Sequence, residues 1–299
     1  MHQSWKILFA ALLLLMSTVA TAADKLPVVA SFSILGDLVS VIGGDRVAIS
    51  TMVGPNQDAH MFAPSPADAK KVAQSKLVVV NGLGFDQWLN RLAGAAGYKG
   101  AIVVASNGIK ARQMSDEGQT GKMHADPHAW QDPANVIIYA GNIAAALAKL
   151  DPAGAGYYQD NRARYVQSLK ELDGWAGQQF AQITAEKRKV ITSHDAFGYL
   201  GARYRITFLA PQGTSTESEA SAKDVARLIR QIQHERIKAV YIENMSDPKL
   251  LQQLSREAGV AMGAKLYSDA LSSPQDVAPT YLKMMRYNIG QLMLGLKLN

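Results

Sequence analysis

A proline-free helical segment near the middle of the chain constrains the fold more than any other feature. Residues 153–187 place apolar side chains at helical spacing without a proline. At 1.5 Å per residue, a helix of roughly thirty residues covers about 45 Å. A helix of this length is too long to be one element within a layer of a small domain. We therefore expect it to run along the molecule and to join two halves.

On both sides of this segment, β-branched runs alternate with stretches of helical spacing. The runs that predict strands are residues 25–33, 45–53, 76–82 and 101–106 before it, and 189–193, 206–211, 237–244 and 260–268 after it. Strands that alternate with helices indicate a parallel sheet covered by helices. We therefore predict an α/β fold with two similar lobes, each a parallel-type sheet flanked by helices. The N-terminal lobe is expected at 23–152, the rigid linking helix at 153–187 and the C-terminal lobe at 188–299.

The first residues have the three parts of a secretory signal peptide. Lys6 is followed by the apolar run ILFAALLLLM and by small residues that end in Ala20-Thr21-Ala22. The apolar run is shorter than the roughly 20 residues of a membrane span. We predict that residues 1–22 are removed, and that no segment of the mature chain crosses a membrane.

The chain contains no cysteine, which limits its location and its chemistry. It cannot form disulfides, and it cannot carry a lipid on an N-terminal cysteine after processing. We therefore expect a freely diffusing periplasmic protein without a lipid anchor. Any metal site has to be built from His, Asp and Glu, because thiolate ligands are absent.

The charge composition argues against nucleic acid as a partner. The formal net charge is +6, and the sequence has neither a run of basic residues nor a basic stretch interleaved with aromatic residues. A nucleic-acid-binding surface usually shows such clustering. We expect a monomeric protein with a mildly basic surface.

Four polar residues fall just beyond predicted strand ends or at a helix entrance. They are His60 in QDAHMFAPSP, His128 in DPHAWQDP, His194 in TSHDAFGYL and Asp269 in LYSDAL. In open α/β sheets, ligands bind at the carboxyl ends of the strands. If the carboxyl edges of the two sheets face each other, these groups converge on a metal site between the lobes. Each residue alone is equally consistent with a hydrogen-bonded loop position, since no tight motif such as H-E-x-x-H links them.

The other histidines are weaker candidates. His2 is removed with the signal peptide, and His234 lies on a predicted solvated helix. His124 lies in the polar segment 107–125, which we interpret as a mobile loop with a surface histidine. A transient contact of His124 with metal is the alternative.

Several stretches together resemble the metal-binding solute-binding proteins of ABC importers, the cluster A-I group that serves zinc, manganese and iron uptake. They are HMFAPSPADAKKVAQSKLVVVNGLGFDQWL, DPHAWQDP, SHDAFGYL, GTSTESEASAKDVARLI, YIEN and LYSDALS, in this order over nearly the whole mature chain. The resemblance implies two α/β lobes joined by a long rigid helix, with metal in the cleft. It implies His60, His128, His194 and Asp269 as the ligands. It also implies a membrane permease and a cytoplasmic ATPase as partners, with capture and delivery of an ion in place of enzymatic chemistry.

The ligand types suggest which metal is carried. Family members that resemble manganese receptors usually have a carboxylate at the position of His194. Three imidazoles and one carboxylate fit tetrahedral Zn²⁺, whereas manganese prefers oxygen ligands. We therefore expect a zinc receptor, with a manganese or iron receptor as the alternative. The segment before His128 has only His124, Asp116 and Glu117 where many zinc receptors have a metal-rich loop, which leaves room for that alternative.

A zinc-dependent hydrolase is the rival from another functional class, because three histidines also form catalytic zinc sites. Here no Glu stands beside a ligand as a general base, and Asp269 would close the fourth position. The protein is therefore not expected to be an enzyme.

Residues that hydrogen-bond to the ligand histidines without binding the metal themselves are expected to fix the imidazole tautomers. The candidates are Asp58, Asp132, Asp195 and Glu243, of which Asp132 and Asp195 are equally well explained as helix caps. Glu217 and Glu219 in STESEAS are expected at the cleft rim or in contact with the permease. A separate periplasmic metallochaperone is a further candidate partner.

Overall fold

The structure is a computed structural model that describes residues 24–115, 123–217 and 220–299. The predicted signal peptide lies outside the described residues, as do Asp116, Glu117 and Glu219. Predictions about these residues stay predictions.

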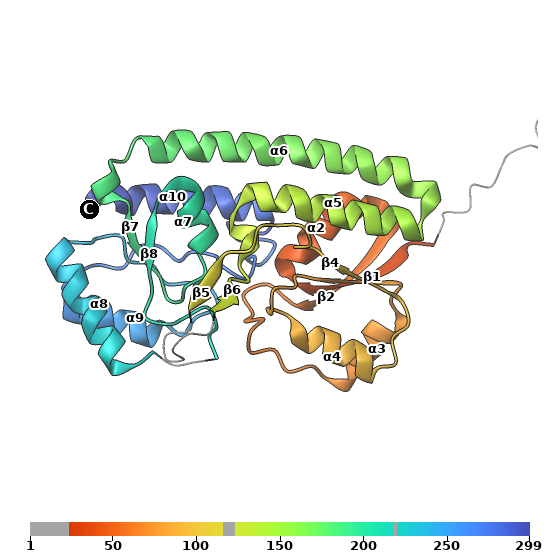
Figure 1. Cartoon of the computed structure of the whole chain (residues 1–299), viewed down its shortest axis with the longest axis horizontal. Coiled ribbons are helices and arrows are strands. Elements are labelled where there is room, and N and C mark those ends of the chain that lie inside the picture. The colour runs from red at the N-terminus through yellow and green to blue at the C-terminus, as the bar shows by residue number, and fades with distance from the viewer. Residues whose placement is uncertain (1–23, 116–122, 218–219) are drawn as a thin grey trace, which may run out of the picture.

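The first half contains a four-stranded parallel sheet of strand order β2-β1-β3-β4. The strands are β1 (Leu26–Phe32), β2 (Val47–Val53), β3 (Leu77–Val80) and β4 (Ala101–Val104). The last five residues of β1 are buried without alternation, because helices cover both faces of the sheet. The helices are α2 (Ser33–Gly43), α3 (Pro66–Gln74), α4 (Gln87–Ala95) and α5 (Pro133–Leu150). Figure 1 shows α2 and α5 on the side of the sheet toward α6, with α3 and α4 on the opposite side.

The second half is less regular than the sequence suggests. Its strands β7 (Lys189–Ile191) and β8 (Thr207–Leu209) pair in parallel. The strands predicted at 237–244 and 260–268 form only isolated parallel bridges, Ile191 with Val240 and Glu243 with Leu266. Glycine weakens a strand, and at Gly263 a Cβ would lie 2.4 Å from the Tyr241 ring, so no side chain fits at this position. The helices are α7 (Gly198–Tyr204), α8 (Ala222–Glu235), α9 (Pro248–Ala258) and α10 (Tyr281–Leu298).

One long helix joins the halves, as predicted. Helix α6 (Ala155–Ala181) is 27 residues long and contacts α2 and α5 of the first half and α7 and α10 of the second. It runs along one side of the whole molecule (Figure 1). Its buried residues recur every three or four positions, at Tyr158, Asn161, Tyr165, Leu169, Leu172, Ala176 and Phe180. This spacing gives one apolar stripe that packs against both halves. The lobe boundaries at 152 and 188 stay predictions.

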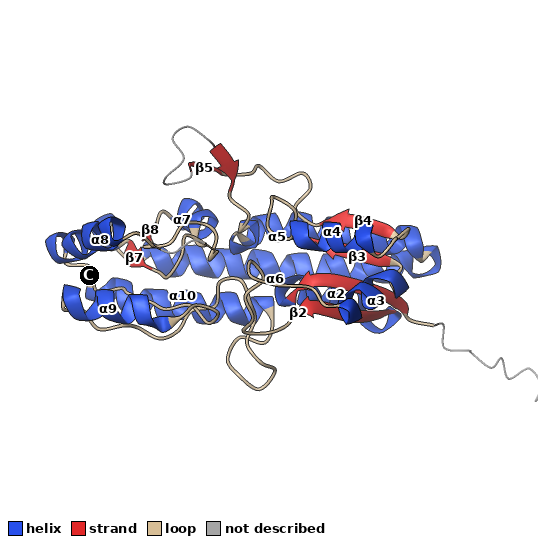
Figure 2. Cartoon of the chain, turned by 90° about the horizontal axis from the view of Figure 1, so that it is seen from below, coloured by secondary structure: helices blue, strands red, loops and turns tan. Residues whose placement is uncertain are grey.

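Two predictions about individual segments have clear outcomes. The polar segment 107–125 is not wholly a loop, because β5 (Gln113–Ser115) and β6 (Met123–Ala125) pair antiparallel and project from the body of the molecule (Figure 2). These strands are too short to give a periodic pattern in the sequence. In the described residues one helix, α5, has the length and hydropathy of a membrane span, but its face with Val136, Ile143 and Leu147 is buried against the protein.

One half-buried carboxyl links the halves through the beginning of α10. Asp37 on α2 accepts a hydrogen bond from the Tyr281 N–H at 2.8 Å. Burial raises the pKa of Asp37 to about 6, and the Tyr281 N–H only partly opposes this rise. Since the folded state then holds this proton more tightly than the unfolded chain, stability falls as the pH rises from about 4 to 6.

We predict that Asp37→Asn stabilises the metal-free protein at pH 7.5 by up to about 2 kcal/mol and has little effect near pH 4. The amide oxygen can still accept from the Tyr281 N–H, while the partly desolvated charge is removed. Urea unfolding at the two pH values measures the effect. Asp45→Asn, which removes a charge at an exposed position, is the control. An equal effect of Asp37→Asn at both pH values would contradict the prediction.

Candidate metal centre

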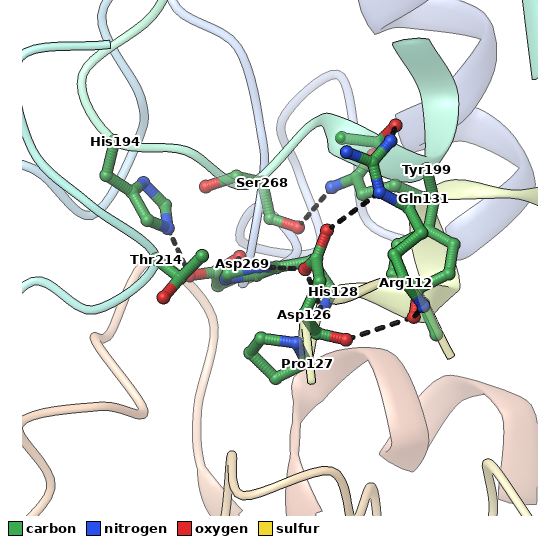
Figure 3. Close-up of polar contacts among 12 residues, drawn as sticks. Arg112, Asp126, Pro127, His128, Gln131, His194, Tyr199, Thr214, Ser268 and Asp269 are labelled. Carbon is green, nitrogen blue, oxygen red and sulfur yellow. Dashed lines mark hydrogen bonds and ion pairs between the residues drawn. The ribbon is translucent and has the colours of Figure 1, made fainter. Parts of the chain in front are cut away.

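The structure brings the four residues His60, His128, His194 and Asp269 together. Each offers one ligand atom, and these atoms all lie within 4.8 Å of one another. His60 follows β2, and His128 precedes the 3-10 turn Ala129–Gln131 that leads into α5. His194 follows β7, and Asp269 follows the bridge residue Leu266. Each half therefore supplies two of the four groups, from chain positions far apart. Figure 3 shows His128, His194 and Asp269.

Asp269 is at the centre of the cluster. Its Oδ2 lies 3.2 Å from His60 Nε2 and 3.0 Å from His194 Nε2. Its Oδ1 lies 3.8 Å from His128 Nε2. The three ring centroids are 5.3 to 5.8 Å apart. All three imidazoles therefore turn the same nitrogen, Nε2, toward one carboxylate.

The donor atoms are removed from water but not paired by hydrogen bonds. The side chains of His128, His194 and Asp269 are 0% exposed and that of His60 is 6% exposed. Among the described residues, the three Nε2 atoms and both Asp269 oxygens are buried without a hydrogen-bond partner. Such atoms normally cost free energy and are rare in native proteins. Lone pairs of nitrogen and oxygen that face one point are well suited to a cation.

The loop between the two Asp-Pro pairs fixes His128. Asp126 Oδ1 accepts hydrogen bonds from the His128 N–H and from Nδ1, each at 3.0 Å. The other oxygen, Oδ2, faces Arg112 Nε at 3.5 Å. The His128 ring packs against Trp130 at 5.3 Å between centroids. These contacts hold the His128 ring on its Nδ1 side, and its Nε2 points toward the other three candidate ligands.

The opposite half holds His194 in a different way. Glu243 Oε1 accepts a hydrogen bond from the His194 N–H at 3.0 Å, and Oε2 lies 2.6 Å from His194 Nδ1. Glu243 is 1% exposed. Of the predicted outer groups, Glu243 is the one that faces a ligand ring.

The two halves meet at the backbone beside Asp269. Ser268 O accepts hydrogen bonds from Trp130 Nε1 and from Gln131 Nε2, each at 2.8 Å. Figure 3 shows Gln131 beside Ser268. The Trp130 ring is fully buried and packs at 4.9 Å from both Phe32 and Phe85. The core of the first half thus positions a ligand of the second half.

His60 is the candidate ligand nearest to solvent. Its N–H donates to Asp58 Oδ1 at 2.8 Å, while Thr216 Oγ1 donates to Asp58 Oδ2 at 2.6 Å from the other half. His60 also lines a cavity of about 530 Å³ together with Phe85, His124, Thr214 and Glu217. Of the four candidate ligands, His60 is the one that lines this cavity.

The electrostatics of the cluster favour a proton where a metal ion would otherwise lie. Burial alone would lower the pKa of His194, but the carboxylates of Glu243 and Asp269 hold it well above its usual value. Burial alone would raise the pKa of Asp269, but His194 and His128 hold it well below its usual range. A cation that enters the site therefore competes with a proton on an imidazole.

The remaining outer candidates have other contacts. Asp132 caps α5 by accepting from the Ala134 N–H at 2.8 Å, as its alternative interpretation predicts. Asp195 donates its N–H to Gly213 O, and burial raises the pKa of its carboxyl. His124 is not the exposed residue we expected, because β6 places it half-buried with Nε2 3.1 Å from Thr214 Oγ1.

The sequence interpretation missed three residues that organise the site: Asp126, Arg112 and Trp130. Asp126 could have been found, because Asp often bonds to the N–H two residues later in an Asx turn. Nothing in the sequence connects Arg112 with Asp126 or Trp130 with Ser268, since these contacts depend on the packing of the two halves.

Comparison with known proteins is consistent with this geometry. The chain matches the family described as zinc-uptake complex component A, periplasmic (ZnuA), over residues 28–294. It is 31% identical over 282 residues to the manganese ABC transporter substrate-binding lipoprotein PsaA of Streptococcus pneumoniae, covering 92% of this chain and 90% of that protein.

Solved structures agree over the same length. The periplasmic zinc binding protein TroA from Treponema pallidum superposes with a TM-score of 0.85 at 27% identity, covering 91% of this chain and 99% of that one. A manganese-bound periplasmic metal binding protein from Candidatus Liberibacter asiaticus gives 0.82 at 28% identity, covering 91% and 100%.

These similarities confirm the predicted α/β fold with its long helix, and they confirm the family resemblance. Members of the family are substrate-binding receptors and not enzymes, so the hydrolase alternative is excluded as predicted. The chain belongs to the zinc-uptake complex component A family of metal-binding receptors of ABC importers.

Proposed function

We propose that this chain captures Zn²⁺ with His60, His128, His194 and Asp269 and delivers it to the permease of an ABC importer, which a cytoplasmic ATPase drives. One observation carries the proposal: three buried Nε2 atoms and a buried carboxylate face one another without hydrogen-bond partners among the described residues. A divalent cation would supply the missing partner for all of them at once.

The donor set supports zinc over manganese. Imidazole nitrogen is a good ligand for Zn²⁺, and structural or transport sites with four protein ligands suit its tetrahedral preference. Mn²⁺ prefers oxygen donors and stands lowest in the usual order of divalent affinities. With three nitrogens and one carboxylate, this site should hold Zn²⁺ more tightly than Mn²⁺.

Manganese is the second candidate, with iron as a weaker one. The observation that favours manganese is similarity: a relative at 31% identity is named a manganese receptor, and a structure at 28% identity holds manganese. Affinity in solution need not decide which ion is carried, because cells control metal availability.

We propose the periplasm as the compartment. The family description includes that word, whereas relatives such as PsaA are named lipoproteins. The 299-residue sequence has no cysteine to carry such a lipid. A free periplasmic protein without a lipid anchor therefore remains our proposal, as do the monomeric state and a metallochaperone partner.

Removing a ligand should abolish tight binding. We expect His194→Ala and Asp269→Ala to lower zinc affinity by more than the about 10- to 100-fold typical of outer-shell changes. Competition with a chromophoric chelator, on metal-stripped protein, measures this. His234→Ala changes an exposed histidine on α8 and is the matched control. Unchanged affinity in the ligand variants would refute the assignment.

Changing one donor should change metal preference. His194→Glu replaces nitrogen with oxygen, so the ratio of zinc to manganese affinity should fall. Because Glu243 faces position 194 at short range, the variant should also be made with Glu243→Gln, which removes the repulsion between two carboxylates. A zinc-to-manganese ratio that stays at the wild-type value in both forms counts against His194 as a ligand.

Binding should release protons and depend on pH. Since the pKa of His194 is held well above its usual value, the ring keeps a proton at neutral pH until metal displaces it. Zinc affinity should therefore continue to rise with pH above about 6.5, the ordinary histidine pKa. Calorimetric titrations in buffers of different ionisation enthalpy count the released protons. Binding at pH 7 without proton release would contradict this prediction.

A further inference from the structure

We propose that Glu243 is a positioning residue for metal capture, whose two carboxylate oxygens together hold His194 in the form that presents Nε2 to the ion. We further propose that an amide can replace Asp126 behind His128 but cannot replace Glu243. The inference rests on the proposed function, since it takes His194 and His128 as ligands.

Glu243 uses its oxygens separately. Oε1 accepts from the His194 backbone N–H at 3.0 Å, and Oε2 lies 2.6 Å from Nδ1 of the same residue. The Glu243 N–H donates to Ser193 Oγ at 3.2 Å, so the residues on both sides of this contact are tied together. The whole arrangement is buried, with Glu243 at 1% and His194 at 0% exposure.

This geometry decides where the imidazole proton resides. A neutral imidazole has one N–H and one lone pair. An ionised carboxylate only accepts, so the nitrogen that faces Oε2 has to be the donor. Once metal has displaced the second proton, Nδ1 carries the one that remains, and the lone pair of Nε2 is directed toward Asp269 and the other two rings.

Asp126 does the same for His128 with a single oxygen. Its Oδ1 accepts from both the His128 N–H and Nδ1, each at 3.0 Å, while Oδ2 faces Arg112 Nε at 3.5 Å. In Asp126→Asn the amide oxygen can occupy the Oδ1 position and keep both bonds. The new NH₂ group then faces Arg112. Asp126→Asn therefore weakens the contact with Arg112 but keeps the hydrogen bonds that hold the His128 ring.

In Glu243→Gln, no orientation of the amide keeps both contacts with His194. If the amide oxygen stays on the backbone N–H, the NH₂ group faces Nδ1 and favours the proton on Nε2, where metal has to bind. If the oxygen turns to Nδ1, the buried backbone N–H of His194 faces another donor. Each arrangement leaves a mismatch that the carboxylate does not have.

The experiment compares wild type, Glu243→Gln and Asp126→Asn in zinc competition titrations, with circular dichroism to establish that each variant folds. We expect Glu243→Gln to lose at least about 10-fold in zinc affinity and Asp126→Asn to lose clearly less. Long-range ¹H–¹⁵N spectra of histidine-labelled, zinc-loaded protein give a second readout. The Nδ1–H signal of His194 should shift in Glu243→Gln relative to the wild type, because the acceptor that faces Nδ1 changes, whereas a merely structural role for Glu243 would leave this signal in place.

Each outcome has one meaning. No zinc binding by the wild type would overturn the proposed function. Tight binding by the wild type together with equal affinity in Glu243→Gln, or an equal loss in both variants, would overturn this inference alone. If Glu243→Gln does not fold, the wild-type spectrum decides. Zinc on Nδ1 of His194, or an Nδ1 proton without the downfield shift of a strong hydrogen bond, would overturn the inference, and a strongly hydrogen-bonded Nδ1 proton would support it.

Discussion

The burial of donor atoms without hydrogen bonds is the constraint on which this structure depends. Each ligand imidazole has two nitrogens, and for His128 and His194 the fold provides a carboxylate behind Nδ1. The Nε2 atoms make no hydrogen bond among the described residues, and all three face the carboxylate of Asp269. The protein alone leaves these nitrogen and oxygen atoms without hydrogen-bond partners, and a bound cation would be the partner that they lack. The same feature explains why a proton competes with metal.

The site also depends on how the halves are joined. His60 and His128 come from one half and His194 and Asp269 from the other, so neither half holds the full ligand set. Trp130 and Gln131 bond to Ser268 O beside Asp269, and α6 packs against helices of both halves. A continuous helix resists large hinge rotation, so we expect metal release to need only small tilts or local loop changes.

The fold could be predicted from local patterns, which also placed the four candidate ligands near strand ends or a helix entrance, but it was the family resemblance that implied them as one ligand set. Alternating strands and helices predict parallel sheets, and the ends of such strands are where His60, His194 and Asp269 occur. The isolated bridges near Tyr241 and Gly263 could not be predicted, because the sequence there has the same β-branched pattern as a regular strand. Arg112 and Trp130 act through residues remote in sequence, which no local pattern reveals. Glu243 was only one of four candidates until its contact with His194 Nδ1 distinguished it.

X-ray absorption at the zinc edge, on protein loaded with one equivalent of zinc, tests the central claim most directly. The account predicts a four-coordinate ion with three imidazole ligands at about 2.0–2.1 Å and one carboxylate oxygen at a similar distance. A six-coordinate shell dominated by oxygen, or fewer than three imidazoles, would contradict it.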